Sequence, residues 1–255
     1  MIAEPQTSHH DGEPLPIYVS GVYKSYHSGP VTAPVLNGVD LAVPRGSCIY
    51  LAGPSGSGKT TLLSILGCIL SADRGVVRIL GRDVAGLTPG EMAALRRDRV
   101  GFVFQRFHLL KGLNVLENAC VPLIVAGVHR RAAARRAMPL LEAVGLADKA
   151  SAQWKNLSAG QCQRVALARA LACNPDLILA DEPTAALDAA NGLQVMELVR
   201  RLTTEQGRTA VVVTHDTRIF SFADRVYWLE GGRIVEAGDG SFAPPAVHQK
   251  EGGSP

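Results

Sequence analysis

Three glycines and a single lysine stand together in GPSGSGKTT, from Gly53 to Thr61. Such a composition does not fill an apolar core, so the stretch is predicted to be a loop. The apolar run CIYLA comes directly before it and predicts a buried strand over Cys48–Ala52. KTTLLSIL follows, with the spacing of an amphipathic helix over Lys59–Leu66. The predicted order is therefore strand, loop and helix.

The loop fits the phosphate-binding pattern GxxxxGK[ST]. Its glycines let the backbone curl, so that successive N–H groups and the N-terminus of the helix point at phosphate oxygens. Lys59 is expected to reach the β- and γ-phosphates, and the Thr60 hydroxyl to bind Mg²⁺. A structural Gly/Ser turn is the alternative, and the strand–loop–helix context disfavours it. The predicted nucleotide contacts are Gly53, Pro54, Ser55, Gly56, Ser57, Gly58, Lys59, Thr60 and Thr61.

Composition narrows the class of protein. The 255 residues include 26 Lys and Arg against 23 Asp and Glu, a net charge of +3, which argues against a chain that coats nucleic acid. Five scattered cysteines without a CxxC pair favour buried free thiols in a reducing compartment. No apolar run reaches the roughly 18 residues of a membrane span, and no secretory signal is recognisable. We expect a cytoplasmic protein that reaches a membrane only through a partner.

Apolar β-branched runs alternate with helical patterns along the chain, which predicts an α/β fold with a largely parallel sheet. An antiparallel β part is expected beside it, and a nearly all-helical lobe over about residues 106–165. Residues 1–16 and 238–255 have the composition of disordered ends, which leaves 17–237 as one domain. The other expected strands are Ile17–Tyr23, Val39–Val43, Val76–Leu80, Val100–Phe104, Leu177–Ala180, Ala210–Thr214 and Val226–Leu229. The other expected helices are Pro89–Arg97, Val115–Val125, Ala132–Val144, Ala159–Ala172, Ala189–Glu205 and Thr217–Phe222, with Arg130, Arg131, Arg135 and Arg136 on a solvated helix face.

Polar residues follow three of the expected buried strands. Asp181 and Glu182 come after LILA, His215 after VVVT, and Gln105 ends GFVFQ. Folds of this class bind ligands at the carboxyl edge of a parallel sheet. Asp181 is the expected Mg²⁺ carboxylate, and Glu182 the expected general base for an attacking water. His215 is expected to contact the γ-phosphate and position that water, and the Gln105 amide to contact the metal and the water.

A second anion site is predicted in LSAGQCQRVALARAL, from Leu157 to Leu171. Ser158 and the small residues after it have the composition of a helix N-terminus, which attracts negative charge. This site is far from the phosphate loop in the sequence. Two phosphate-binding devices so far apart suggest that two chains share each nucleotide.

Together these motifs resemble the ATP-binding subunit of ABC transporters. The resemblance rests on GPSGSGKTT, FVFQ, LSAGQ, LADEP, AALD and VVVTHD, and it covers about residues 17–237. LLSILGCIL, RRDRVGFVFQRFHLL, NVLENACVPL and ADEPTAALD are similar to the lipoprotein-release and macrolide-export branch, whose members work with permeases of the FtsX/MacB type. The resemblance implies a P-loop NTPase fold with a RecA-like α/β core, an antiparallel β subdomain and a helical signature subdomain. It also implies an ATPase that drives transport, with ATP and Mg²⁺ as cofactors.

The resemblance further implies a head-to-tail homodimer that encloses two ATP molecules. Ser158, Gly160 and Gln161 of one chain would face the γ-phosphate held by the other chain, with Asp188 at the dimer interface. Tyr26 matches the aromatic residue that stacks on adenine, and Tyr23 is the competitor. The implied partners are an integral membrane permease and, in addition, a periplasmic adaptor. No nucleic-acid partner is expected.

Departures from the family pattern and rival functions remain. Ala159 and Ala185 stand where the family usually has glycine, and Trp154 where a proline is common. Ala159 retains its backbone N–H, so phosphate contact survives if the local backbone is helical.

One rival function is that of an ATP-dependent regulator of a membrane partner that moves no cargo. The other, a soluble ABC protein of DNA repair or translation, is disfavoured by the single compact cassette.

The stretch that follows Gln105 is the expected contact with the permease. RFHLLKGLNVLENACVPL, from Arg106 to Leu123, is unusually apolar for a connection. Core packing explains some of its residues, and an exposed subset would form a groove for a short permease helix. The residues concerned are Phe107, Leu109, Leu110 and Leu113.

Overall fold

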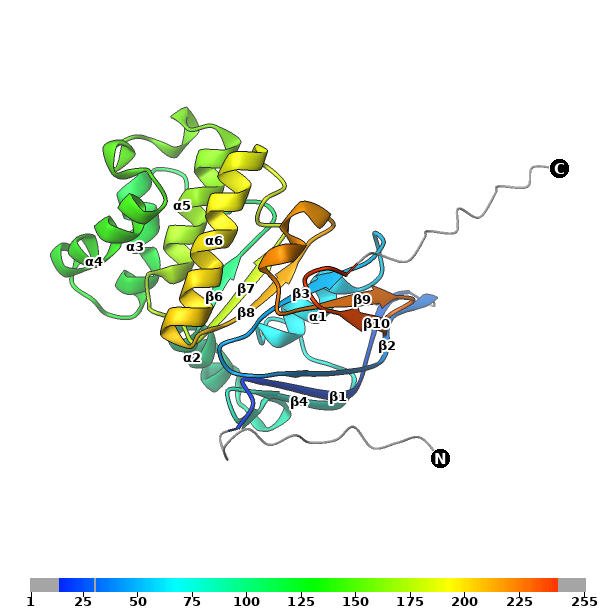
Figure 1. Ribbon diagram of the computed structural model, residues 1–255. Helices are drawn as coiled ribbons and strands as arrows, with labels where there is room; N and C mark the ends of the chain where they lie inside the picture. The colour runs from blue at the N-terminus through cyan, green and yellow to red at the C-terminus, as the bar shows by residue number, and fades with distance from the viewer. Residues whose placement is uncertain (1–13, 30, 243–255) are drawn as a thin grey trace, which may run out of the picture.

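The computed structural model describes residues 14–29 and 31–242 (Figure 1). Most of the predicted leader (1–16) and tail (238–255) therefore lies outside the described residues. The fold contains a six-stranded sheet in the order β10-β9-β3-β8-β7-β6 and a four-stranded sheet in the order β2-β1-β4-β5. The predicted α/β architecture, a largely parallel sheet with an antiparallel β part beside it, is confirmed.

The larger sheet carries the loop Gly53–Thr61 at one end of its central strand. Every residue of β3, β7 and β8 is buried. Strands covered on both faces read as unbroken apolar runs, which explains why these three were recognisable in the sequence. The strands are β3 (Cys48–Ala52), β6 (Val100–Val103), β7 (Leu177–Asp181), β8 (Thr209–Val213) and β9 (Arg225–Glu230), all parallel, with β10 (Arg233–Gly238) antiparallel to β9.

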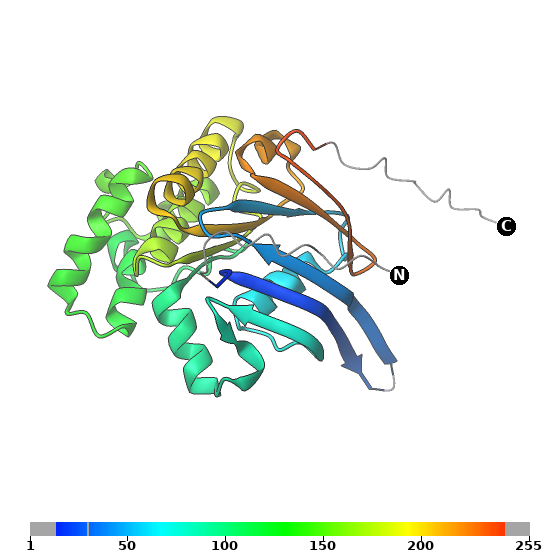
Figure 2. The same cartoon turned by 60° about the horizontal axis from the view of Figure 1, so that its bottom comes forward.

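The smaller sheet is antiparallel throughout and lies beside helix α1 (Lys59–Leu66), as Figure 2 shows in blue and cyan. Ile17 and Leu36 of this sheet share one apolar core with Leu62 of α1 and Leu51 of β3. The helix that begins at the phosphate loop is thus fixed between the two sheets. The strands are β1 (Ile17–Ser28), β2 (Val31–Val43), β4 (Arg74–Ile79) and β5 (Arg82–Asp83).

Four further helices cover the other face of the large sheet, and a fifth, α2, packs into the core that contains α1. α5 and α6 lie beside that sheet, and α3 and α4 form the outer part of a helical lobe (Figure 1). A second core cluster joins them to the sheet through Tyr50, Val103 and Val212. The helices are α2 (Pro89–Arg99), α3 (Val115–Val125), α4 (Arg130–Ala143), α5 (Ala159–Leu171) and α6 (Ala189–Gln206), with short 3₁₀ turns η1 (Val84–Gly86), η2 (Ala147–Lys149), η3 (Trp154–Asn156) and η4 (Thr217–Phe222).

Three differences from the expected elements have local causes. β1 and β2 are longer than predicted. Their outer halves are largely exposed and lack the apolar alternation by which a strand is recognised in a sequence. β10 was not predicted, since four of its six residues are exposed at the sheet edge. The segment Thr217–Phe222 is a 3₁₀ helix, capped by the Asp216 carboxylate, which accepts from the Arg218 N–H.

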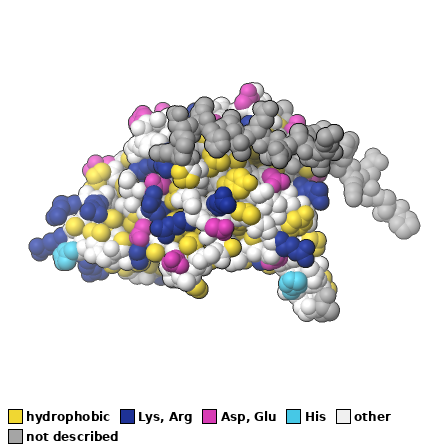
Figure 3. All heavy atoms as spheres, turned by 90° about the horizontal axis from the view of Figure 1, so that it is seen from below, with side chains coloured by type: hydrophobic (Ala, Val, Ile, Leu, Met, Phe, Trp, Pro, Cys, Tyr) yellow, Lys and Arg dark blue, Asp and Glu magenta, His cyan; other side chains and the backbone are white. Residues whose placement is uncertain are grey.

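The arginines of α4 and the cysteines lie where the sequence predicts them. The four arginines of α4 are exposed, and basic side chains gather at the left end of the face in Figure 3. All five cysteines are free; Cys173 is half-buried and the other four are buried. Burial raises the pKa of the Cys48 thiol to about 12. Within residues 14–29 and 31–242, no helix is both long and apolar enough to cross a membrane.

Candidate functional site

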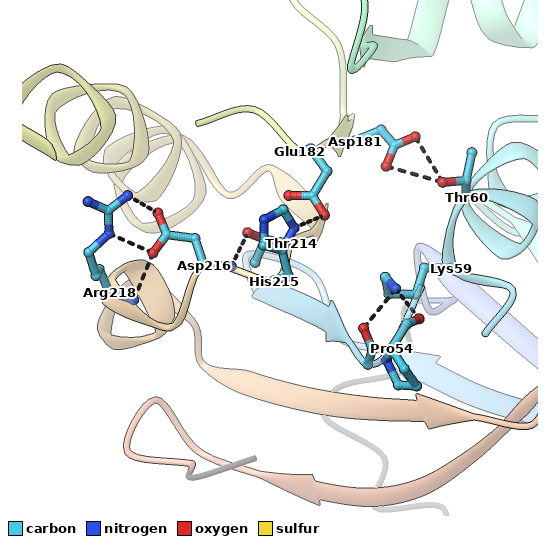
Figure 4. A network of polar contacts seen from close by, with 10 residues as sticks. Pro54, Lys59, Thr60, Asp181, Glu182, Thr214, His215, Asp216 and Arg218 are labelled. Carbon is cyan, nitrogen blue, oxygen red and sulfur yellow. Dashed lines mark hydrogen bonds and ion pairs between the residues drawn. The ribbon is translucent and has the colours of Figure 1, made fainter. Parts of the chain in front are cut away.

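The parallel register brings the predicted site residues to one edge of the large sheet. Val213 of β8 pairs with Leu51 of β3 and with Asp181 of β7, and Val103 of β6 pairs with Ala180. These four neighbouring strands therefore end together. The phosphate loop, Glu182, His215 and Gln105 all follow directly from those ends, and Figure 4 shows Lys59, Thr60, Asp181, Glu182 and His215 around one space.

Two glycines of the phosphate loop are required by its shape. Gly53 has a φ of +141°, and a Cβ atom there would collide with the carbonyl oxygen of Leu229. Gly58 has a φ of +106°, and a Cβ atom would lie 2.7 Å from Leu36 Cδ2 and 2.9 Å from the Val35 carbonyl oxygen. Other residues rarely adopt such conformations, and here they would also clash. The motif glycines thus allow the loop to curl against β2 and β9.

Lys59 reaches back over the loop that precedes it. Its Nζ donates to the carbonyl oxygens of Gly53 at 2.9 Å and Pro54 at 2.8 Å. Burial lowers the pKa of Lys59, while the charges of Glu182 and Asp181 act in the opposite direction. The ammonium group therefore lies inside the curl of backbone, facing the two carboxylates.

Thr60 and Asp181 join the start of α1 to the end of β7. The Thr60 hydroxyl donates to Asp181 Oδ2 at 3.0 Å. Burial raises the pKa of Asp181, the neighbouring Glu182 raises it further, and the Thr60 hydrogen bond and Lys59 lower it. A hydroxyl and a carboxylate oxygen are thus held side by side next to the Lys59 ammonium.

Glu182 and His215 form a second polar pair at the same edge. Glu182 Oε1 lies 2.8 Å from His215 Nδ1, and the Glu182 side chain is buried. Glu182 has a φ of +49°, and its N–H donates to the Val213 carbonyl at 2.8 Å. A positive φ outside glycine is a strained conformation that often occurs at functional sites. The strain places the carboxylate beside the exposed imidazole.

The carboxylate and imidazole border a hollow of about 400 Å³. Asp216 and Arg218 form a bidentate ion pair at its rim, with two guanidinium contacts of 2.8 Å. Ala185, one of the two alanines that stand where the family usually has glycine, also lines it. The complete lining is Glu182, Thr184, Ala185, Leu187, His215, Asp216, Thr217 and Arg218.

The predicted second anion site is an intact helix N-terminus. Ser158 Oγ accepts from the Gln161 N–H at 3.2 Å, and Gln161 Oε1 accepts from the Ser158 N–H at 2.9 Å, a capping box. Ala159 is the first residue of α5 and has no positive φ, so its methyl group fits the helical backbone. A Cβ atom at Gly160 would lie 2.9 Å from Leu187 Cδ2. α5 and α1 lie in different parts of the molecule (Figure 1), so this site does not meet the phosphate loop of the same chain.

The remaining predicted contacts differ in how the structure places them. The Tyr26 hydroxyl lies 3.4 Å from Thr61 Oγ1, beside the phosphate loop, whereas the Tyr23 hydroxyl lies over Gly38. Asp188 caps α6, and its carboxylate accepts from the Asn191 N–H at 2.9 Å. Gln105 is exposed just beyond β6.

Sequence reasoning missed two residues that hold the segment after Gln105. The Arg169 guanidinium and the Asn118 amide both bond its backbone. The sequence offered no distinct signal for either residue, because both helices carry other polar side chains.

The comparisons with known proteins agree with this geometry. The sequence matches the ABC transporter family over residues 36–185. It is 47% identical over 224 residues to the macrolide export ATP-binding/permease protein MacB 1/2 of Paracoccus denitrificans, and 46% identical over 219 residues to MacB of Sodalis glossinidius. These alignments cover 88% and 86% of this chain and 33% of each relative. The chain thus spans about a third of the length of the curated relatives it matches.

Solved structures share this fold over most of the chain. A dimeric post-hydrolysis state of the ATP-binding cassette MJ0796, bound to ADP and Pi, has a TM-score of 0.84 at 39% identity, over 88% of this chain and 98% of that one. CbiO1 from Clostridium perfringens has a TM-score of 0.78 at 24% identity, over 89% and 90% of the two chains, and shares the fold. The chain therefore belongs to the ABC transporter family and is an ATPase cassette of that family.

Proposed function

We propose that this cassette powers a separate membrane permease of the FtsX/MacB type, for export or for extraction of a lipid or lipoprotein. The observation that supports ATP hydrolysis by the cassette is the Glu182–His215 pair, 2.8 Å apart, at the sheet edge that also carries the phosphate loop. The MacB relatives are named as combined ATP-binding and permease proteins, which supports the choice of branch.

The residues at the edge fit ATP with Mg²⁺. Mg²⁺ prefers oxygen ligands and keeps several waters or phosphate oxygens. Thr60 and Asp181 offer two protein oxygens held together at 3.0 Å, and Gln105 is the proposed third. Among the described residues no three His, Cys, Asp or Glu side chains gather as a metal site. When bound, Mg²⁺ neutralises charge on the phosphates.

In the proposed reaction, Glu182 is the base. A water oxygen attacks the γ-phosphorus, the bond from that phosphorus to the bridging oxygen breaks, and Glu182 takes the water proton. One carboxylate oxygen is held by His215, which leaves the other for the proton. Lys59 would exchange its bonds to the loop carbonyls for bonds to phosphate oxygens, and so stabilise the developing charge.

A head-to-tail dimer would complete the site. Ser158, Gly160 and Gln161 lie at the N-terminus of α5, and the positive end of a helix dipole attracts anions. In one chain that helix lies away from the phosphate loop, so the phosphate it serves would belong to a partner. The solved cassette of 39% identity is dimeric, which supports this arrangement.

The proposed permease contact is the apolar stretch after Gln105. Leu110 is 47% exposed, whereas Leu109 packs against the core. Phe107 and Leu113 are half-buried. The stretch thus divides into residues that anchor it and residues that offer an open apolar surface.

The test is affinity purification of the tagged chain from solubilised membranes. We expect an FtsX/MacB-type integral membrane protein to be retained by the wild-type chain and lost with Leu110→Ser. Val235→Ser, at an exposed position on β10, is the matched control and should retain it. Both variants should keep basal ATPase activity within about twofold. Surface substitutions rarely change the free energy of unfolding by more than about 0.5 kcal/mol, so both chains should remain folded. Retention of the permease by a well-folded Leu110→Ser variant would reject this docking surface.

A further inference from the structure

Two side chains of the helical lobe hold the backbone that follows Gln105. Arg169 of α5 donates through Nη2 to the Phe107 carbonyl at 2.8 Å and through Nη1 to the His108 carbonyl at 2.7 Å. Asn118 of α3 accepts from the Leu110 N–H at 2.7 Å and donates to the carbonyl oxygens of Leu110, Leu113 and Asn114. The segment is therefore fixed at two points to two different helices.

The Arg169 contact is unusual in its charge. Among the described residues, no carboxylate lies within ion-pair distance of its guanidinium. Arg169 is half-buried, and burial lowers its pKa. A cation that is partly withdrawn from water without a counter-charge is unfavourable. Two backbone carbonyls are its charge-assisted partners. If Arg169 served only to fill space, a neutral or apolar side chain at this position would lose less solvation free energy on burial.

The held segment is also strained. His108 has a φ of +49°, and its ring stacks on Phe104 at 5.0 Å, while Phe104 stacks on Phe102 of β6 at 4.2 Å. Gln105 lies within this stacked turn, immediately after Phe104. A strained turn persists only where its surroundings fix it. Arg169 supplies that constraint from the carbonyl of the strained residue itself.

α5 connects this clamp to the signature residues. Ser158 caps the start of α5, and Arg169 lies near its end, about 16 Å along the helix axis at 1.5 Å per residue. Eight of the 13 residues of α5 are buried, so the helix is packed on most of its surface. Arg169 and the cap residue Ser158 thus lie at the two ends of one packed helix.

We infer that Arg169 is a positioning residue for ATP hydrolysis, which ties the turn containing Gln105 to α5 and so sets the placement of Gln105 and of the signature residues together. The inference rests on the ATPase activity of the cassette and not on which permease it serves. It assigns to one arginine the connection between the two motifs within a chain.

A double-mutant cycle tests the connection. Gln105→Ala and Arg169→Gln are each expected to lower kcat about tenfold. Arg169→Gln should leave ATP binding to the monomer unchanged, because it leaves the phosphate loop, Thr60 and Asp181 untouched. If both act through the same turn, the double variant should be about as slow as the slower single variant. If the two residues acted independently, their effects would multiply and the double variant would lose about a hundredfold in kcat.

Arg164 provides the matched control. It lies five residues earlier on α5 and donates to the Val144 carbonyl at 3.1 Å, away from Gln105. Arg164→Gln should combine with Gln105→Ala multiplicatively, within about twofold. A merely structural role for Arg169 would give the same multiplicative result as Arg164, and that result would overturn the inference.

A conservative variant covers the case in which Arg169→Gln does not fold. Arg169→Lys keeps the charge and can bond one of the two carbonyls, so it should retain more activity than Arg169→Gln and the same non-multiplicative relationship with Gln105→Ala. Circular dichroism and thermal unfolding establish that each variant is folded. Multiplicative effects of Arg169→Lys and Gln105→Ala in folded chains would also overturn the inference.

Discussion

Glu182 Oε1 and His215 Nδ1 lie 2.8 Å apart at the ends of two adjacent parallel strands. The pairing of Asp181 with Val213, and the bond from the Glu182 N–H to the Val213 carbonyl, fix the two backbones immediately before this contact. The distance between carboxylate and imidazole is therefore set by the sheet. Groups placed in this way need little reorganisation before they act on a water.

The first prediction concerns His215. If it orients Glu182, His215→Ala should lower kcat about 100-fold, within the range for a group in proton transfer. ATP affinity of the monomer should change less than about threefold, because Lys59 and the loop backbone remain. Steady-state hydrolysis and equilibrium binding separate the two effects. Weaker ATP binding with kcat unchanged would assign His215 to nucleotide binding alone.

The second prediction concerns the base of the nucleotide. If Tyr26 stacks on adenine, Tyr26→Ala should weaken ATP binding by about 1–3 kcal/mol. Tyr26→Phe should be nearly silent, since the hydroxyl contact with Thr61 is long, 3.4 Å, and exposed. Tyr23→Ala is the control, because that hydroxyl lies over Gly38. Weaker binding with Tyr23→Ala and not with Tyr26→Ala would reverse the assignment.

The third prediction concerns Ala159, the first residue of α5. Ala159→Gly should leave the ATP affinity of the monomer unchanged, because in the shared-site arrangement this residue faces the partner's nucleotide. Its effect should appear in the protein-concentration dependence of hydrolysis. A change in monomer affinity, measured by titration at low protein concentration, would argue that each chain completes its own site.

The fourth prediction concerns Asp181, whose pKa burial raises above the ordinary value of an aspartate, about 3.9. In nucleotide-free protein the ionised form is then disfavoured by folding, so Asp181→Asn should raise the thermal stability of the chain at pH 7. Between the raised folded value and 3.9, the native state binds the proton and the unfolded state does not. The gain should therefore shrink as pH falls through this window and vanish below it. Thermal unfolding at several pH values measures this. A gain that is constant with pH would have another cause.

Much of the site was predictable because its residues follow strands buried on both faces. LILA and VVV are unbroken apolar runs, so the positions of Asp181, Glu182 and His215 at their ends could be inferred before any geometry. The shape of the phosphate loop followed from its glycines. Both inferences depend on residues close together in the sequence.

What the sequence could not predict depends on distant or irregular backbone. Arg169 bonds carbonyl groups 61 and 62 residues away, and a carbonyl leaves no mark on residue type. The positive φ of Glu182 is imposed by its bond to Val213, on another strand. β10 is an exposed edge strand without apolar alternation. In each case tertiary contacts, and not local preference, determine the structure.

The central claim is that two chains share each ATP and that Glu182 removes the proton from water. Glu182→Gln keeps the size of the side chain and removes its basicity, so closure should persist while turnover falls by about 100-fold or more. Sizing chromatography of this variant, with and without ATP, is the most direct measurement. The account predicts a monomer without ATP and a stable dimer with it, beside a nearly complete loss of phosphate release. A variant that stays monomeric with saturating ATP, or that hydrolyses ATP at a near wild-type rate, would contradict it.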